Sequence, residues 1–302
     1  MATRRKEYKE AMQMRHCIIM TAYQDLPMIN HFIQAIPSDW GVYVHLDAKS
    51  VINESEIDAK AKVYKIKKIY WGAWEHLWVF MYLLNEASKE NKYDYYHLVT
   101  GQDYFASSPA QFDEILGNDK NSYIGVFSIP NKHWGWEGGE KIFKYRTISS
   151  FADIRKPFPK AINKIAYIMQ KMLRCTKPLP AMKLYGGSVY SSLHSDFVDW
   201  LLKDEDSQNL LKSLKHTTCA EEVYIPTAIM NSPYSKKCIC QNLRYDDWST
   251  SPAPKYLDDS DFHRIMGAHR LFCRKVDSLK SSELLKLLDG NVIGDYKSMS
   301  TK

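Results

Sequence analysis

The chain has 302 residues, of which 45% are hydrophobic and 25% are charged, and its formal net charge is +6. This composition is ordinary for a soluble globular protein. No basic run is dense enough to indicate a nucleic-acid-binding protein, and no apolar stretch approaches the roughly 20 residues that a membrane-spanning helix needs. The length allows one large α/β domain or two small ones.

The six cysteines and the N-terminal sequence together indicate the cellular compartment in which the protein folds. No apolar segment follows the basic first residues, as it would in a signal peptide. The sequence therefore predicts free thiols in a reducing cytoplasm. Cys238-x-Cys240 has no second Cys or His pair nearby, so it does not indicate zinc. Aromatic residues make up 13% of the chain; most belong in a core, although their flat faces also suit sugar binding.

Strand and helix patterns alternate along the first third of the chain. The predicted strands lie in residues 16–23, 41–50, where the strand ends at Asp47, 61–70, and 93–109, where the strand runs into a Gly-containing turn. The predicted helices are 25–36, which Asp25 is placed to cap, and 73–89. This alternation predicts a three-layer α/β/α sandwich with a mixed, mostly parallel central sheet.

Ligands of open α/β sheets bind where the strands end. Polar, aromatic and glycine residues stand at these ends in this sequence: Tyr23, Asp47, Trp71-Gly72 and Gly101-Gln102-Asp103. The sequence therefore predicts a ligand site along the carboxyl edge of the sheet.

The middle of the chain has a different character. Residues 131–155 are rich in Gly, Trp and charge, which is typical of a long functional loop. Residues 158–175 follow as a basic, amphipathic helix. One interpretation is a solvated helix that packs through its apolar residues Ile162, Ile165, Ile168, Met169 and Met172. The other is contact with a membrane surface or with the lipid of an acceptor.

The last third completes a single domain. Residues 184–202 contain a Gly-Gly-Ser turn and a segment that Ser195 or Asp196 is expected to cap. Residues 221–232 predict a helix with two acids in its first turn, and residues 238–248 predict a strand that carries Arg244 outward. Residues 260–277 predict a capped helix that becomes extended, and residues 281–289 predict a last helix. The charged residues 1–10 predict a frayed tail or a helix start, and residues 294–302 predict disorder.

Common phosphate-binding and nucleophile motifs are absent from the sequence. It contains no G-x-x-x-x-G-K-[ST], G-x-G-x-x-G or G-x-S-x-G pattern. Asp258-Asp259-Ser260-Asp261 contains an Asp-x-Asp of the kind that binds a metal ion in some sugar-nucleotide enzymes. It follows a Pro-rich turn and precedes a helix, so helix capping is the favoured interpretation and a metal site is the alternative.

Seven segments, in order, resemble one family: VHLDAKS, WGAWEHL, YHLVTGQDY, YGGSVYSSL, EEVYIPTAIMNSP, LRYDDWS and HRLFCRKVD. They are similar to the core-2/I-branching N-acetylglucosaminyltransferase and peptide O-xylosyltransferase family, glycosyltransferase family 14, over about residues 16–277. The resemblance implies one GT-A-like domain over residues 1–302, with a donor-binding half at about 14–130 and an acceptor and catalytic half at about 131–290. It also implies a UDP-sugar donor, inversion to a β-linkage and no divalent cation or other cofactor.

The resemblance assigns roles position by position. Glu222 matches the catalytic base, and Arg244 and Lys275 match the two cations that bind the donor diphosphate. The positions expected at the donor nucleotide or sugar are Ala22, Tyr23, Asp47, Trp71, Gly72, Asp103, Gly187 and Ser188. Glu221 is left as a neighbour at the helix start, and Arg270 and Arg274 as surface charge.

The chemistry of inverting transfer agrees with these roles. A carboxylate must take the proton of the acceptor hydroxyl, and fixed cations must balance the charge that grows on the diphosphate when no metal does so. Transfer by a metal-dependent GT-A enzyme through Asp258–Asp261 and an inactive carbohydrate-binding protein are the alternatives.

The sequence departs from the vertebrate members of the family, which carry a stem, a membrane anchor and many disulfides. It is therefore expected to be a bacterial enzyme of surface polysaccharide synthesis, cytoplasmic or peripheral at the inner face of the membrane. Its expected acceptor is an oligosaccharide or a lipid-linked saccharide. The candidate acceptor contacts are Trp134, Trp136, Glu137, Lys144 and Arg146, with Lys141 as a further cation.

Overall fold

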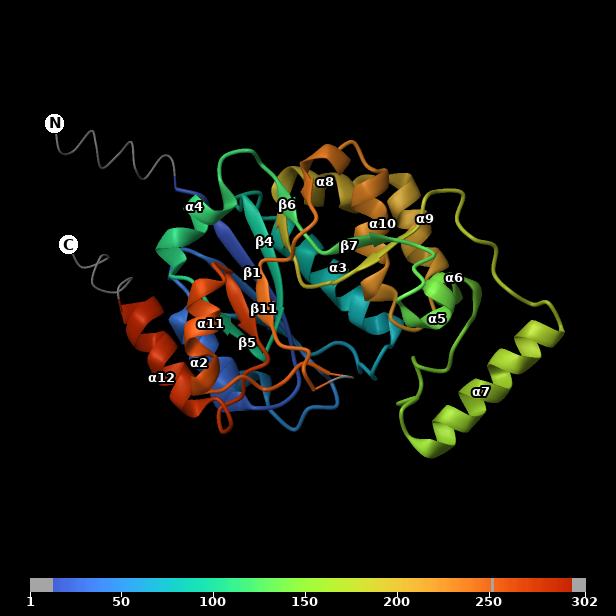
Figure 1. Cartoon of the computed structure of the whole chain (residues 1–302), viewed down its shortest axis with the longest axis horizontal. Helices are drawn as coiled ribbons and strands as arrows, with labels where there is room; N and C mark the ends of the chain where they lie inside the picture. The colour runs from blue at the N-terminus through green and yellow to red at the C-terminus, as the bar shows by residue number, and fades with distance from the viewer. Residues whose placement is uncertain (1–12, 251–252, 295–302) are drawn as a thin grey trace.

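A seven-stranded sheet forms the centre of the protein (Figure 1). The structure is a computed structural model that describes residues 13–250 and 253–294. The strands of this sheet are β1 (His16–Ala22), β2 (Gly41–Leu46), β3 (Lys62–Tyr64), β4 (Tyr95–Thr100), β6 (Ser122–Tyr123), β9 (Ser192–His194) and β10 (Cys238–Ile239). Their order is β10-β6-β9-β4-β1-β2-β3. Only β9 runs antiparallel to its neighbours within this described sheet, which confirms the predicted mixed, mostly parallel sheet.

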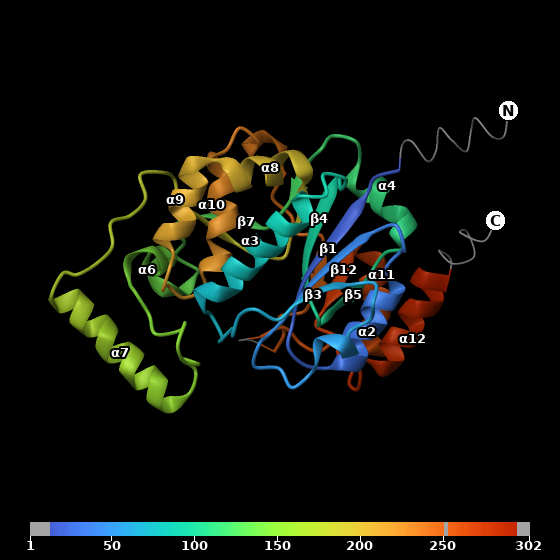
Figure 2. The ribbon, with the colours of Figure 1, turned by 180° about the vertical axis from the view of Figure 1, so that it is seen from behind.

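Helices cover both faces of the sheet, because successive residues of its buried strands point to opposite sides. In β1, Ile18 and Met20 join one hydrophobic core, whereas Cys17 and Ile19 join the other. The first core includes residues of α2 (Leu26–Ala35), α11 (Phe262–Gly267) and α12 (Ser282–Leu288). The second includes residues of α3 (Trp74–Ser88), α8 (Ser195–Lys203), α9 (Glu205–Ser213) and α10 (Tyr224–Asn231). Figures 1 and 2 show the two helical layers, so the predicted three-layer sandwich is confirmed.

Two smaller sheets lie beside the main one. The first has the order β11-β12-β5, formed by β11 (Arg244–Asp246), β12 (Phe272–Arg274) and β5 (Asp103–Phe105). The second pairs β7 (Val126–Ser128) with β8 (Tyr185–Gly187) in antiparallel orientation. The other α-helices of the described residues are α4 (Phe112–Leu116), α5 (Gly135–Gly138), α6 (Glu140–Lys144) and α7 (Pro157–Met172). Both smaller sheets join strands that lie far apart in the sequence.

Several predicted boundaries hold and others need correction. Asp25 caps α2, with its side chain accepting a hydrogen bond from the Met28 N–H at 3.2 Å. The cap of α8 is His194 rather than Ser195 or Asp196, because the His194 Nδ1 accepts from the Asp196 N–H at 3.1 Å. A side chain one residue earlier than expected therefore satisfies this helix end.

Two predicted strands are shorter or divided. Of the predicted strand 61–70, only β3 pairs with β2, because the backbone of residues 67–69 instead bonds to the loop that follows β2. The predicted strand 238–248 divides into β10, at the edge of the main sheet, and β11, in a smaller sheet. The sequence pattern of residues 238–248 thus predicted an extended backbone correctly. It did not show that this segment passes from the main sheet to a smaller one.

The expected packing of helix 158–175 is wrong. Helix α7 has no buried residue, and its apolar residues Ile162, Ile165, Ile168, Met169 and Met172 are exposed. All six cysteines are free, as predicted. Within residues 13–250 and 253–294, no helix combines the length and the apolar character needed to cross a bilayer. The predictions for residues 1–10 and 295–302 lie outside the described residues.

Candidate active site

A cleft of about 620 Å³ opens where β1, β2 and β4 end. It is lined by seven of the residues predicted from the sequence: Ala22, Tyr23, Asp47, Trp71, Gly72, Glu222 and Lys275. Ala22, Tyr23 and Asp47 lie at the ends of β1 and β2. Trp71 and Gly72 lie in the turn before α3, and Glu222 and Lys275 lie in the C-terminal third of the chain. Parallel strands end at one edge, so residues far apart in the sequence meet there.

One wall of the cleft combines a fixed carboxylate with open aromatic rings. Asp47 is buried and accepts hydrogen bonds from the Lys49 N–H at 2.8 Å and from the Lys49 ammonium at 2.7 Å. Tyr23 and Trp71 are exposed at the cleft. The Arg155 guanidinium lies 5.5 Å from the centre of the Trp71 ring. This wall offers flat faces and polar groups, which suits a nucleoside.

A carboxylate pair forms another part of the cleft. Glu221 and Glu222 lie in the 3-10 turn Ala220–Glu222, so both precede α10 rather than begin it. Glu221 contacts the His76 Nδ1 at 3.3 Å, and the His76 Nε2 contacts the Thr21 hydroxyl at 3.2 Å. Glu221 is therefore a neighbour of the helix start, as expected, and also a buried cleft residue that contacts His76 of α3.

Glu222 has the electrostatics of a proton acceptor. It lines the cleft, and burial together with the adjacent Glu221 raises its pKa to about 8. In the described part of the chain, its carboxylate forms no hydrogen bond or ion pair. A carboxylate with a raised pKa and free oxygen atoms can accept a proton from a bound hydroxyl near neutral pH.

Lys275 supplies positive charge to the same cleft. It follows β12, and its half-buried ammonium forms no ion pair with any described residue. Burial and the neighbouring Arg274 lower the pKa of Lys275. A cleft cation that has no ion-pair partner among the described residues suits a bound anion.

Arg274 is not the surface charge that was expected. It is buried, its guanidinium lies 3.5 Å from the centre of the Tyr190 ring, and its Nε is 3.5 Å from the Asp103 carboxylate. Asp103 is fully buried beneath the cleft, where its carboxylate accepts from the Thr100 N–H and hydroxyl, each at 2.6 Å. Asp103 thus fixes the turn after β4 through Thr100. Its contact with Arg274 connects this turn to the segment that carries Lys275.

Arg244 lies inside the protein rather than outward. It is buried, and its guanidinium donates to the Ser192 hydroxyl at 2.8 Å and to the carbonyls of Ser191 at 2.7 Å and Leu98 at 3.2 Å. The expected outward orientation is wrong. Arg244 lies on β11, at the edge of the sheet β11-β12-β5, and its guanidinium packs over the ring of Phe272 on the neighbouring strand. Arg244 is not among the residues that line the cleft.

Gly187 and Ser188 also lie outside the cleft lining. The Ser188 hydroxyl accepts a hydrogen bond from the N–H of Tyr190 at 3.2 Å, which fixes the segment that carries this cleft residue. A Cβ at Gly187 would lie 1.8 Å from the carbonyl oxygen of Gly125, so glycine is required for the pairing of β7 with β8.

The substitution Gly187→Ala is therefore expected to lower the free energy of unfolding by about 3 kcal/mol, because two backbones must separate. Urea denaturation measures this change. Gly267→Ala is the matched control, since nothing lies within 4 Å of the added methyl group. Equal midpoints for the two variants would show that the close approach does not limit stability.

The five candidate acceptor contacts are not gathered in the cleft. Trp134 packs edge-on against Phe127, Glu137 accepts a hydrogen bond from Tyr167 at 2.6 Å, and Lys144 pairs with Glu140. The Arg146 backbone bonds to α7. Trp136 lies in α5. Of the five, Glu137 and Arg146 contact α7, and any part that the group plays with an acceptor stays a prediction.

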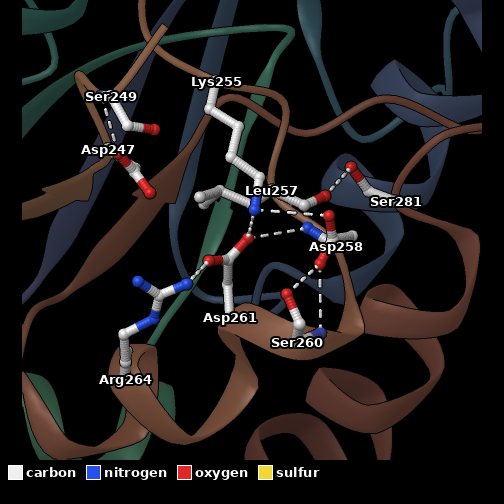
Figure 3. Close-up of polar contacts among 9 residues, drawn as sticks. All are labelled: Asp247, Ser249, Lys255, Leu257, Asp258, Ser260, Asp261, Arg264 and Ser281. Carbon is white, nitrogen blue, oxygen red and sulfur yellow. Dashed lines mark hydrogen bonds and ion pairs between the residues drawn. The ribbon is translucent and has the colours of Figure 1, made fainter.

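The Asp-x-Asp segment caps a helix, as predicted (Figure 3). Asp258 accepts from the Ser260 N–H at 3.1 Å, and Asp261 accepts from the Asp258 N–H at 3.0 Å. Asp261 also forms ion pairs with Lys255 at 2.9 Å and with Arg264 at 2.5 Å. The carboxylates of Asp258 and Asp261 thus have protein partners, and no residue of 258–261 lines the cleft.

Sequence reasoning missed several cleft residues that lay inside segments it had singled out. They are His76, Arg155, Tyr190 and Glu221. His76, Tyr190 and Glu221 belong to three of the seven ordered motifs, and Arg155 ends the loop 131–155. The Arg155 guanidinium forms two bonds to the Asp153 carboxylate, at 2.9 and 2.7 Å. Their motifs were the available signal, but spacing alone did not show which members face the cleft.

Comparison with known proteins identifies the family of this chain. A family model described as Core-2/I-Branching enzyme matches residues 18–270. The chain is 26% identical to xylosyltransferase 2 of Rattus norvegicus over 130 residues, which are 37% of this chain and 15% of that protein. It is 25% identical to xylosyltransferase 1 of Rattus norvegicus over 132 residues, 37% of this chain and 16% of that protein. The match thus spans a small part of these relatives' length, whereas the family model spans most of the chain. The chain belongs to the core-2/I-branching enzyme family.

Proposed function

We propose that this protein is an inverting, metal-independent glycosyltransferase. It transfers a sugar from a UDP-sugar to a hydroxyl group of an oligosaccharide or lipid-linked saccharide and forms a β-linkage. The setting that we propose is the assembly of a bacterial surface polysaccharide. Membership of the family supports a glycosyltransferase, and the arrangement of the cleft supports the finer statement.

The observation that carries the proposal is the meeting of Glu222 and Lys275 in one cleft. One is a carboxylate with a raised pKa, and the other is a half-buried cation with no ion-pair partner in the described residues. A base and an anion-binding group at one site fit displacement of a diphosphate by a hydroxyl group.

The reaction is a single displacement at the anomeric carbon of the donor. The bond from the acceptor oxygen to this carbon forms as its bond to the diphosphate oxygen breaks. The proton of the acceptor hydroxyl moves to Glu222, and the bonding electron pair leaves with UDP. Lys275 stabilises the charge that grows on the diphosphate, and Asp103 with Arg274 positions Lys275.

The pKa of Glu222 predicts activity that rises with pH. The base must be ionised, and its pKa in the free enzyme is about 8. We expect kcat/KM for the acceptor to rise about tenfold per pH unit below this value and to level off above it. Initial rates across this range measure the profile. A midpoint at the ordinary value of 4.5 would contradict the assignment.

A panel of nucleotide sugars tests the function as a whole. We expect one UDP-sugar to raise the melting temperature and to release UDP when a saccharide acceptor is added. Activity that requires manganese and is abolished by EDTA would instead support the metal-dependent alternative. Binding of saccharides without any release of UDP would support an inactive carbohydrate-binding protein.

A further inference from the structure

Helix α7 turns its apolar side to the outside. In Figures 1 and 2 it lies at one end of the protein, away from the central sheet. Its apolar stripe consists of Phe158, Ile162, Ile165, Ile168, Met169 and Met172, whose spacing of three, four and seven residues places them on one face. Phe158 is 76% exposed, Ile165 58% and Met172 78%. Folding alone therefore leaves the stripe uncovered.

The opposite, polar side of α7 holds the helix to the protein. The Asn163 side chain accepts from the Ile148 N–H at 3.1 Å, and the Gln170 side chain exchanges two hydrogen bonds, each of 2.9 Å, with the backbone of Arg146. The Tyr167 hydroxyl donates to a carboxylate of α5 at 2.6 Å. These three residues share one face, so the contacts fix the orientation that exposes the stripe.

The charge of the segment indicates what covers the stripe. Residues 154–195 contain eight Lys and Arg and no Asp or Glu. Without these eight, the 41 basic residues of the chain fall to 33, against 35 acidic residues, so the remainder has a net charge of −2. The net positive charge of the protein therefore depends on residues 154–195, the segment that carries the stripe. A negative surface is its electrostatic complement.

We propose that α7 docks the protein on an anionic lipid bilayer. The stripe enters the boundary between headgroups and acyl chains, and Lys160, Lys164 and Lys171 contact the headgroups. A second copy of this chain is a poorer occupant, because two segments with the same charge and no acidic residue repel one another.

Docking also orients the cleft. Asp153, Arg155 and Lys156 line the cleft, and α7 begins at the next residue, Pro157. The helix that would contact the bilayer therefore follows directly, in the same segment of chain, the residues that line the cleft. If the proposed function holds, a lipid-linked acceptor meets the enzyme at this surface, and that consequence rests on the proposed function.

Vesicle flotation of the full chain tests the proposal. We expect the protein to float with vesicles of phosphatidylcholine mixed with phosphatidylglycerol and to stay behind with phosphatidylcholine alone. The double variant Ile165→Glu/Met172→Glu is expected to lower partitioning into the mixed vesicles by about tenfold or more, because each substitution places a negative charge in the stripe. Its melting temperature should match that of the unaltered protein, since neither side chain is buried.

The double variant Val51→Glu/Leu279→Glu is the matched control. Both positions are exposed, at 94% and 85%, both lie outside residues 154–195, and the change in net charge is the same. Equal loss of partitioning in the two double variants would overturn the proposal, as would failure of the unaltered protein to float. A dimer in light scattering that the α7 variant dissociates would identify a second copy as the occupant. Release of UDP with a water-soluble acceptor should be unchanged in the α7 variant, which separates this proposal from the proposed function.

Discussion

The substitution Glu222→Gln is expected to reduce sugar transfer by about 10²–10⁴-fold, because an amide cannot accept the proton of the acceptor hydroxyl. Glutamine keeps the size and polarity of the side chain, so binding of the donor should change little. Release of UDP from the donor measures the rate, and equilibrium binding of UDP measures the integrity of the cleft. A variant that transfers sugar at nearly the original rate would show that another group is the base.

The same variant should be more stable than the unaltered protein at alkaline pH. The pKa of Glu222 is about 8 in the folded chain and has its ordinary value of 4.5 when unfolded, so the folded state binds more protons between these values. Stability is thus lost as pH rises through this window, and glutamine removes the loss. Urea denaturation should show a gain of about 1–3 kcal/mol above pH 8 and none near pH 4.5.

The substitution Lys275→Ala is expected to lower kcat/KM for the donor by about 10²–10³-fold. The ammonium is half-buried in the cleft, where a fixed charge stabilises an anion far more than it does in water. The loss should be the same in EDTA and in manganese, because on the proposed mechanism the balancing charge belongs to the protein. Transfer restored by manganese would contradict that mechanism.

Lys286→Ala is the control for this loss of charge. Lys286 is exposed and pairs only with Glu283 among the described contacts, so its removal should change turnover little. Lys275→Arg is expected to retain part of the activity, since the charge remains while its shape changes. An equal loss in the Lys275 and Lys286 variants would indicate a general effect of net charge on donor association.

The elements that the sequence predicted well are those with a strong local pattern. The helices around Met28–Phe32 and Leu77–Leu84 repeat apolar residues at helical spacing, and the buried strands at Ile18 and Val42 are continuous apolar runs. The carboxyl ends of these two strands were sufficient to place Tyr23 and Asp47 in one cleft, because parallel strands bring their ends to the same edge.

The features that sequence patterns missed depend on partners distant in the chain. Arg244 and Arg274 lie in segments whose polar residues suggest exposure. Both are buried because β11 and β12, which carry them, form a sheet with β5, from the first half of the chain. The His76–Glu221 contact joins residues 145 positions apart. For α7, helical spacing correctly predicted an amphipathic helix but not which side would face the protein, since hydrogen bonds of Asn163 and Gln170 decide that.

The position of β12 has a consequence for the order in which the protein is made. This strand lies between β5 and β11, so residues near 103 and 244 cannot join in one sheet until residue 272 has been synthesised. Lys275 follows directly after it. A chain still growing on the ribosome therefore lacks Lys275 in the cleft until almost all of its residues have been added. If the proposed function holds, the cation that stabilises the leaving diphosphate is in place only when translation is almost complete.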